Sequence, residues 1–531
     1  MKNKLLIALF ACLFTFFLLS VASDYLVAGG ASAMRSNDFF DGPEAEPCAH
    51  ADFDCDGFAD LAVRVPGESI AGAKHAGAVH VLFGSALGLT SGRSQFLHQN
   101  IAGMQESSEG DDWFGEETTI GDFNGDGFSD LAIGVCGEDL GLTKNAGLTH
   151  VLYGSPEGLS TEESQVWRQA GVRTNDFFGE DLVAGDFDGD GYDELAIGVP
   201  GKDVDGTVNA GITAVLYGSP TGLTADRTQF WCQGNIGAGD GMETNDSFGE
   251  ELAANDFDDD GYDDLAIGSY GESIDGTLMA GAVSVLYGHP SGLTNQRSQF
   301  WHQESPGIAD AAEQGDRFGE ELASSDFNGD GYADLAIAAF YNVLAGVQDA
   351  GAVHILYGSP SGLAAEGSQF LNQNSPGMNE IVEEDDRFGW SLAANDFNGD
   401  GFGDLAIGVP KEDLGPLVNC GVVHVIYGSP DGLSSEGIQM WNQNSPGVAG
   451  VTKQDDGFGW ELASQDFDSD GFADLVVGTP GKDINGMKDA GAITILYGSP
   501  EGISAEGSRM MHQDSPGIAD QAEPYDAFGL L

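Results

Sequence analysis

The chain has 531 residues and a formal net charge of −67, which arises from 19 basic and 86 acidic side chains. A polyanion of this size is repelled by nucleic acids and by anionic lipid surfaces, so both classes of partner are excluded. Hydrophobic residues make up 41% of the chain and glycine contributes 80 residues, which is typical of a folded and turn-rich protein. The acidic side chains are therefore either solvated or engaged with cations.

The first 33 residues have the features of an export signal. Lys2 and Lys4 precede an apolar run that extends from Leu5 to Ala22, and small residues suited to cleavage follow at 20–22 and 31–33. We predict a cleaved signal peptide over residues 1–33 and a secreted or cell-surface protein, or else a periplasmic one. An uncleaved anchor is the alternative, and a lipoprotein signal at Cys12 is a weaker one. After cleavage, no stretch is apolar enough to span a membrane.

Five cysteines follow the signal, at positions 48, 55, 136, 232 and 420. An odd and scattered set describes neither a disulfide framework nor a zinc site. Cys48 and Cys55 are close enough in sequence to form a disulfide.

A nine-residue pattern, D-F-[DN]-x-D-G-[FY]-x-[DE], recurs along the chain. Its copies occupy residues 52–60, 122–130, 186–194, 256–264, 326–334, 396–404 and 466–474. The steps between copies are 70 residues, except for one of 64. A Phe-Gly pair stands eight residues ahead of six copies and appears once more at 528–529. A fixed long period indicates a repeat architecture, so residues 34–531 are predicted to form one domain.

Each repeat predicts four short strands. In the fifth repeat these cover residues 318–325, 334–338, 350–357 and 368–373, with a Gly-Ser-Pro turn before the last. Seven such units describe an all-β, seven-bladed β-propeller of four-stranded antiparallel blades, with one acidic loop in each blade. A parallel β-helix is the rival, but its coils are much shorter than this period.

The ring is expected to close through its two ends. The first repeat has a degraded lead strand around Phe39 and Phe40, whereas residues 524–531 contain a lead strand with no repeat behind it. We predict that this last segment completes the first blade. An incomplete sequence is the alternative explanation.

The acidic pattern is predicted to bind calcium. Positions 1, 3, 5 and 9 carry oxygen-bearing side chains in every copy, and position 6 is always glycine, which tolerates the left-handed backbone of a tight loop. Hard cations with six to eight oxygen ligands require such a set. Position 7 is aromatic, and its ring is expected to pack inward while its carbonyl supplies a further ligand. An EF-hand is excluded because position 12 is valine or isoleucine and a strand follows directly.

The predicted ligands of about seven calcium ions are, loop by loop, Asp52, Asp54, Asp56, Phe58 and Asp60; Asp122, Asn124, Asp126, Phe128 and Asp130; Asp186, Asp188, Asp190, Tyr192 and Glu194; Asp256, Asp258, Asp260, Tyr262 and Asp264; Asp326, Asn328, Asp330, Tyr332 and Asp334; Asp396, Asn398, Asp400, Phe402 and Asp404; and Asp466, Asp468, Asp470, Phe472 and Asp474.

Together with Val-Pro-Gly at 65–67 and 199–201, the Phe-Gly pairs and acidic loops resemble the FG-GAP repeat. That repeat builds the amino-terminal propeller of integrin α-subunits and occurs in many bacterial surface proteins. The resemblance implies calcium on the loop side and partner contacts on the loops and rim of the opposite face. Integrin propellers usually keep metal loops in only some blades, whereas all seven are intact here. The sequence contains neither a D-x-S-x-S pattern nor Arg-Gly-Asp.

We therefore expect a monomeric, non-catalytic platform for adhesion or for binding an extracellular or surface protein. A carbohydrate-binding propeller is the alternative, because Trp167, Trp231, Trp301 and Trp441 recur at one strand position, although inter-blade packing also explains them. A hydrolase related to the propeller-containing glycosylphosphatidylinositol-specific phospholipase D family is less favoured. Such enzymes add a separate catalytic domain, for which the propeller leaves no residues. His80, His150, His354 and His424 share one strand position in different repeats and are expected to be structural.

Overall fold

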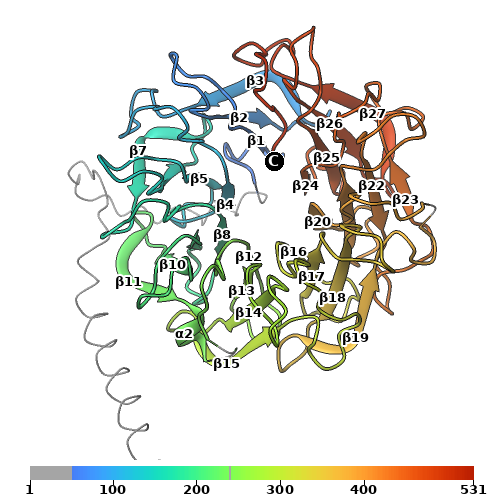
Figure 1. Ribbon diagram of the computed structural model, residues 1–531. Helices are drawn as coiled ribbons and strands as arrows, with labels where there is room; N and C mark the ends of the chain where they lie inside the picture. Colours follow the sequence, from blue (N-terminus) through green and yellow to red (C-terminus); the bar gives the residue numbers. More distant parts are fainter. Residues whose placement is uncertain (1–50, 238, 240, 379) are drawn as a thin grey trace, which may run out of the picture.

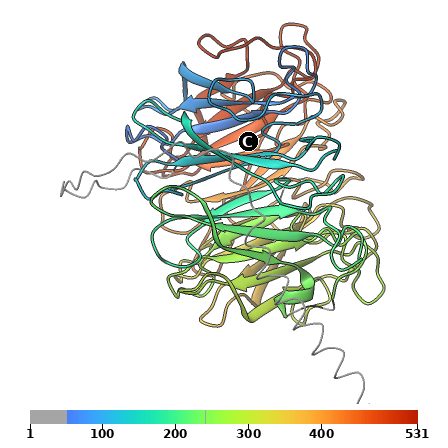
Figure 2. The ribbon, with the colours of Figure 1, turned by 90° about the vertical axis from the view of Figure 1, so that its left-hand side faces the viewer.

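The computed structural model describes residues 51–237, 239, 241–378 and 380–531, which form seven antiparallel sheets arranged around a central axis (Figure 1). This arrangement confirms the predicted seven-bladed β-propeller. Figure 2 shows that the strands run across the thickness of the ring, with loops projecting at both strand ends. The predicted signal peptide over residues 1–33 and Cys48 lie outside the described residues. Cys55 is disulfide-bonded.

Six blades have four strands, and successive strands step outward from the axis to the rim. The innermost strands are β4 (Thr118–Gly121), β8 (Leu182–Gly185), β12 (Leu252–Asn255), β16 (Glu321–Ser325), β20 (Leu392–Asn395) and β24 (Leu462–Gln465). The second strands are β1 (Leu61–Val65), β5 (Asp130–Val135), β9 (Glu194–Val199), β13 (Asp264–Ser269), β17 (Asp334–Ala339), β21 (Asp404–Val409) and β25 (Asp474–Thr479).

The two outer strand positions complete each blade. The third strands are β2 (Ala78–Phe83), β6 (Leu148–Tyr153), β10 (Ile212–Tyr217), β14 (Ala282–Tyr287), β18 (Ala352–Tyr357), β22 (Val422–Ile426) and β26 (Ala492–Tyr497). The rim strands are β3 (Thr90–Leu97), β7 (Ser160–Trp167), β11 (Thr224–Trp231), β15 (Thr294–Trp301), β19 (Ala364–Leu371), β23 (Gln439–Trp441) and β27 (Ser504–Met511). A short helix, α2 (Gln233–Ile236), follows β11.

The core lies between the blades. The second strands are buried along their whole length, because both faces of each sheet are covered by the neighbouring blades. One cluster joins Phe123, Val151 and Trp167 of one blade to Leu195 and Ile197 of the next. Apolar residues on both faces of the strand are therefore what a radial stack of sheets requires.

The Phe-Gly pair links each blade to the one before it. Phe178 is fully buried, and its backbone N–H donates to the carbonyl of Ala146 in the preceding blade at 3.2 Å. Gly179 has a φ of 85° and donates to Gly198 at 3.0 Å. A Cβ at Gly134 of the preceding blade would lie 2.2 Å from the Gly179 carbonyl oxygen, so these two backbones can approach only without side chains.

The first blade has three strands of its own, β1 to β3. On the inner side of β1, the Arg64 N–H donates to the Leu530 carbonyl at 2.8 Å, and the two residues form an antiparallel bridge. Phe528 pairs with Gly491 of the seventh blade in the same way that Phe178 pairs with Gly147. The end of the chain thus lies where the innermost strand of the first blade belongs (Figure 1).

Candidate metal sites and central channel

Each acidic loop joins the innermost strand position of a blade to its second strand. In the third blade, β8 ends at Gly185 and β9 begins at Glu194, which is the ninth residue of the loop. Because the strand order is the same in each blade, the seven loops lie on one face of the ring, which we term the loop face. The second strands run from the loop face to the opposite face.

The first residue of each loop holds the turn together. In the third blade, the Asp186 carboxylate accepts hydrogen bonds from the N–H groups of Gly189 and Gly191 at 2.7 and 3.0 Å. Gly191 has a φ of 87°, and the sixth residue of every loop has a similar value. A Cβ at Gly191 would meet nothing within 4 Å, so the backbone angle and not space requires glycine here.

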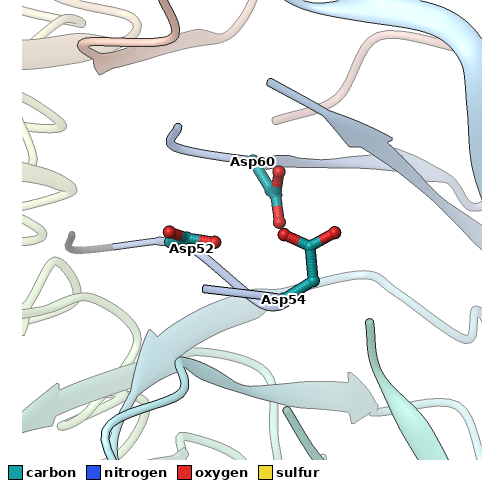
Figure 3. Close-up of side chains that lie close together, drawn as sticks. All are labelled: Asp52, Asp54 and Asp60. Atoms are coloured by element: carbon teal, nitrogen blue, oxygen red, sulfur yellow. The ribbon is translucent and has the colours of Figure 1, made fainter. Parts of the chain in front are cut away.

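Carboxylates from the two ends of a loop converge. Oxygen atoms of Asp52, Asp54 and Asp60 lie within 4.8 Å of one another, and all three side chains are buried. Figure 3 shows these carboxylates facing one another across the loop. Asp186, Asp188 and Glu194 form an equivalent group, while the first, third and fifth residues come together in the loop that begins at Asp256.

In four loops, one carboxylate oxygen of the third residue has no hydrogen-bond partner among the residues that the structure describes. The Oδ1 atoms of Asp54, Asp188, Asp258 and Asp468 are buried and accept no hydrogen bond. The first three of these residues are only 7, 5 and 6% exposed. A buried carboxylate oxygen without a donor is costly, and in each of these loops that oxygen lies beside further carboxylates. A hard cation fits such a donor set.

The loops fall into two groups according to a contact with the rim strand. The guanidinium groups of Arg93, Arg227 and Arg297 pair with Oδ2 of Asp54, Asp188 and Asp258, respectively. Where the position corresponding to these arginines is Glu163, Gly367 or Gly437, the third loop residue is Asn124, Asn328 or Asn398. In the seventh loop the third residue is Asp468, and the position that corresponds to the arginines is Gly507. This is the only loop with an aspartate at the third position and a glycine opposite it. At ligand positions 1, 3, 5 and 9, the seventh loop therefore has four carboxylates and no arginine opposite its third residue.

The ninth residue anchors the loop to its blade. In Asp264, Oδ2 accepts the Phe257 N–H at 3.0 Å and Oδ1 accepts the Gly288 N–H at 2.8 Å. Burial is the main cause that raises the pKa of Asp264 to about 8, and nearby Asp258 contributes to this rise. Glu194 takes the same place with its longer side chain, and it accepts from Phe187 at 2.8 Å. Neutralisation by a cation or by protons is therefore favourable at this position.

Two predicted ligand positions behave differently from the rest. The fifth-position aspartates, such as Asp56, are exposed to solvent. The aromatic ring at the seventh position packs sideways and not inward: the Tyr192 ring lies against Gly125 of the preceding loop, and the Tyr262 ring lies against Gly189. These rings connect consecutive loops around the face.

The central channel is strongly acidic. A cavity of about 420 Å³ on the axis is lined by nine acidic side chains and one arginine. These residues are Glu116, Glu117, Glu180, Asp181, Glu250, Glu251, Glu320, Glu321, Glu461 and Arg64. Arg64 pairs with Glu117 at 2.6 Å and with Glu461 at 3.7 Å. Sequence reasoning missed this site, although acidic pairs directly after Phe-Gly in four repeats were a visible signal.

Burial governs the chemistry of the channel carboxyls. Desolvation is the main cause that raises the pKa of Glu180, Glu320 and Glu461 to about 7, and neighbouring glutamates contribute to the rise at Glu180 and Glu461. The pKa of Asp181 is raised well above its usual range for the same reason, and its Oδ2 atom accepts no hydrogen bond. The channel therefore favours a positively charged occupant.

Aromatic rings gather at the channel end on the opposite face. The Trp390 ring centroid lies 4.8 Å from those of Phe340 and Trp460. Arg387 lies over the Trp390 ring and Lys411 over the Trp460 ring, each at 5.2 Å. This aromatic mouth places large, partly exposed rings beside a negative cavity.

The recurring histidines lie in the blade cores. Burial lowers the pKa of His150 to about 3, and Phe114 packs against its ring with centroids 5.6 Å apart. His80, His354 and His424 occupy the same position in other blades and are also buried. Because each belongs to a different sheet, they do not form a shared site.

The recurring tryptophans pack between blades. Trp167 is buried, and its indole N–H donates to Gln165 at 3.1 Å. Trp301 and Trp441 make the same bond to the glutamine two residues earlier and contact the inter-blade clusters. Within the described part of the chain, no helix has the length and apolar character needed to cross a bilayer.

Fold and site together define a seven-bladed β-propeller with an acidic turn in every repeat. The chain belongs to the FG-GAP repeat family, whose repeat matches residues 49–82, 114–152, 178–216, 248–286, 318–356, 388–426 and 458–496. This match confirms the resemblance inferred from the Phe-Gly pairs and loops.

Curated relatives share part of this region. The chain is 32% identical to integrin alpha-PS2 of Drosophila melanogaster over 269 residues, which cover 49% of this chain and 17% of that protein. It is 36% identical to phosphatidylinositol-glycan-specific phospholipase D of Mus musculus over 186 residues, which cover 35% of this chain and 21% of that enzyme. The chain thus spans about a fifth of these relatives. Among solved structures, the exotype rhamnogalacturonan lyase YesX matches 78% of this chain and 64% of its own chain at 13% identity with a TM-score of 0.34.

Proposed function

We propose that this protein is an exported, calcium-binding β-propeller that acts as a non-catalytic platform for adhesion or protein interaction at the cell surface. The calcium part rests on the acidic loop that recurs in all seven blades: its carboxylates converge in the loops that begin at Asp52, Asp186 and Asp256, and a buried third-position carboxylate oxygen lacks a donor in four loops. Calcium supplies the positive charge that these oxygens lack, with six to eight oxygen ligands. The predicted export signal and the similarity to integrin α-subunits support the surface location.

The partner surface in this proposal is the aromatic mouth and the channel behind it. Partly exposed tryptophans at the rim of a cavity are the residue type that most often anchors protein interfaces. The nine channel carboxyls attract basic side chains and repel acidic ones. We therefore expect an extracellular protein partner that presents lysine or arginine to this face.

Carbohydrate binding is the alternative, and one groove on the rim favours it. Trp441 lines a cavity of about 420 Å³ between the sixth and seventh blades, together with Gln439, Pro446 and Ser504. Polar groups beside an indole face suit a sugar ring. The recurring tryptophans otherwise support inter-blade packing, which weakens this alternative.

The experiment compares Trp390→Ala with Trp441→Ala in the calcium-loaded protein. Pull-down from the surface of producing cells and a glycan array are measured in parallel, and thermal melts show that both variants fold. Loss of protein capture only with Trp390→Ala supports the proposal. Glycan binding that is lost only with Trp441→Ala favours the alternative, and release of lipid-anchored proteins by the purified chain would overturn the non-catalytic assignment.

A further inference from the structure

A second set of charged residues recurs on the opposite face, away from the acidic loops. In each blade it combines an aspartate two residues before Phe-Gly, the residue three positions before that aspartate, and the third residue after the second strand. We call these three residues the triad. The triads are Glu523, Asp526 and Glu68; Glu109, Asp112 and Glu138; Arg173, Asp176 and Lys202; Glu243, Asp246 and Glu272; Glu313, Asp316 and Asn342; Glu383, Asp386 and Glu412; and Lys453, Asp456 and Lys482, from the first blade to the seventh.

The other two residues of the triad differ in charge from blade to blade, and they do so together. Both are glutamate in four blades and both are basic in two, while the fifth blade has Glu313 and Asn342. The aspartate itself never changes, and in each blade its Oδ2 atom accepts the backbone N–H of the first triad residue, as at Arg173 in the third blade, at 2.8 Å. If these side chains were simply solvated, the charges at the two positions would be expected to vary independently from blade to blade. The pairing indicates that each triad keeps a defined charge balance.

The basic triads show where a positive charge resides. In the seventh blade, the Lys482 ammonium is 2.7 Å from Asp456 Oδ2 and 2.6 Å from Oε1 of Gln443, and it also donates to the Val451 carbonyl. Lys482 is only 4% exposed. In the third blade, Lys202 likewise lies 2.7 Å from Asp176. A cation thus sits between blades in a shell of amide, carbonyl and carboxylate oxygens.

The glutamate triads keep the carboxylates and the glutamine but have no ammonium, and the glutamine amide presents its Nε2 and not its oxygen to the glutamate. In the first blade, oxygen atoms of Glu68, Glu523 and Asp526 lie within 4.8 Å of one another. Gln513, which corresponds to Gln443, is 1% exposed, and its Nε2 donates to Glu68 at 2.7 Å. Its Oε1 atom is buried and has no hydrogen-bond partner in the described part of the chain. Gln99 and Gln373 repeat this arrangement in two other glutamate blades.

We propose that each of the four glutamate triads binds one calcium ion at the place that the lysine ammonium occupies in the basic triads. In the first blade the ligands are the carboxylates of Glu68, Glu523 and Asp526, together with the Gln513 amide turned over so that its oxygen takes the place from which Nε2 donates to Glu68. These are hard oxygen donors of the kind that calcium selects. Glu523 is exposed at the edge of the triad, which gives the ion a path to solvent. The chain then holds eleven ions, four of them between blades.

A proton is the competing occupant. Without a cation, burial and the carboxyls of Asp526 and Asp520 raise the pKa of Glu68 to about 9. Burial likewise raises the pKa of Glu138 to about 8, with Asp112 as the next cause. The experiment must therefore count metal directly.

The test exchanges the two triad types in the full-length protein. Glu68→Lys with Glu523→Lys copies the seventh blade into the first, and Lys453→Glu with Lys482→Glu does the reverse. Bound calcium is counted by mass spectrometry after equilibrium dialysis at pH 7.5. We expect eleven ions in the unaltered protein, ten after the first exchange and twelve after the second. Glu501→Lys with Glu506→Lys on the exposed rim changes the net charge equally and should leave the count at eleven.

Unchanged counts in both exchange variants would overturn the proposal and assign protons to the glutamate triads. If the buried lysine prevents folding, Glu523→Lys alone, which alters an exposed residue, should still remove one ion. Failure of the acidic loops to bind calcium would lower the count equally in all variants. The differences between variants would then persist, so the two ideas are tested separately.

Discussion

The ninth residue of an acidic loop offers the sharpest test of loop chemistry, and Asp264→Asn is the change of choice. Both carboxylate oxygens of Asp264 accept a backbone N–H, one from Phe257 and one from Gly288. An asparagine has a single oxygen, so one of these buried N–H groups loses its acceptor. Such a loss costs about 1–3 kcal/mol in the free energy of unfolding and does not depend on calcium.

A second effect of Asp264→Asn appears only with calcium. A bound ion stabilises the folded state by RT ln(1 + [L]/Kd), so a 100-fold rise in free calcium above Kd contributes about 2.7 kcal/mol per site. A variant that has lost the site gains about 2.7 kcal/mol less than the unaltered protein over the same range. The calcium-independent and calcium-dependent effects are therefore separable in one series.

The assay is urea denaturation followed by circular dichroism at several calcium concentrations. Asp431→Asn, an exposed change of the same chemistry in a surface turn, serves as the matched control and should follow the unaltered protein. If Asp264→Asn shifts the unfolding free energy by the same amount at every calcium concentration, the ninth residue is not a calcium ligand and our interpretation of the loops is wrong.

Three further predictions follow from charge. Asp468→Asn should weaken terbium luminescence at its loop more than Asp54→Asn does, because Arg93 already balances Asp54; equal losses would contradict the role assigned to the arginine. In chelator, the melting temperature should decrease as the pH is raised from 5 to 8. The ninth-position acids have folded pKa values of about 7 to 9, above their unfolded values, so the folded state binds more protons than the unfolded state. A melting temperature that rises with pH would contradict this. Lys482→Ala should lower the free energy of unfolding by about 3–5 kcal/mol in urea titrations, because it leaves Asp456 buried and unpaired. A change of less than about 1 kcal/mol would show that the ion pair is dispensable.

The architecture was predictable because the information is periodic. A 70-residue spacing with apolar runs beside each acidic loop specifies both the number of blades and the side on which the loops lie. The glycine at the sixth loop position was predictable too, because its positive φ depends on the local turn alone. Calcium itself stays a prediction.

Features that depend on contacts between distant segments were not predicted. Arg93 meets Asp54 across 39 residues, and only the folded blade brings the rim strand over the loop. The channel forms where the inner edges of several blades meet, so no single repeat reveals that Glu180 and Glu250 face one cavity. The sideways packing of Tyr192 likewise depends on the spacing between two blades, which the sequence of one repeat does not contain.

The bridge between Arg64 and Leu530 also determines when the ring can close during synthesis of the chain. These residues are 466 positions apart, so at about 5–20 residues per second the first blade waits roughly 20–90 s on the ribosome for its inner edge. During that interval β1 exposes an unpaired strand edge, which invites association with other chains. The ring therefore closes only after synthesis of the last blade, and a short extension or clipping at Leu530 would act on the entire molecule and not on one end of it.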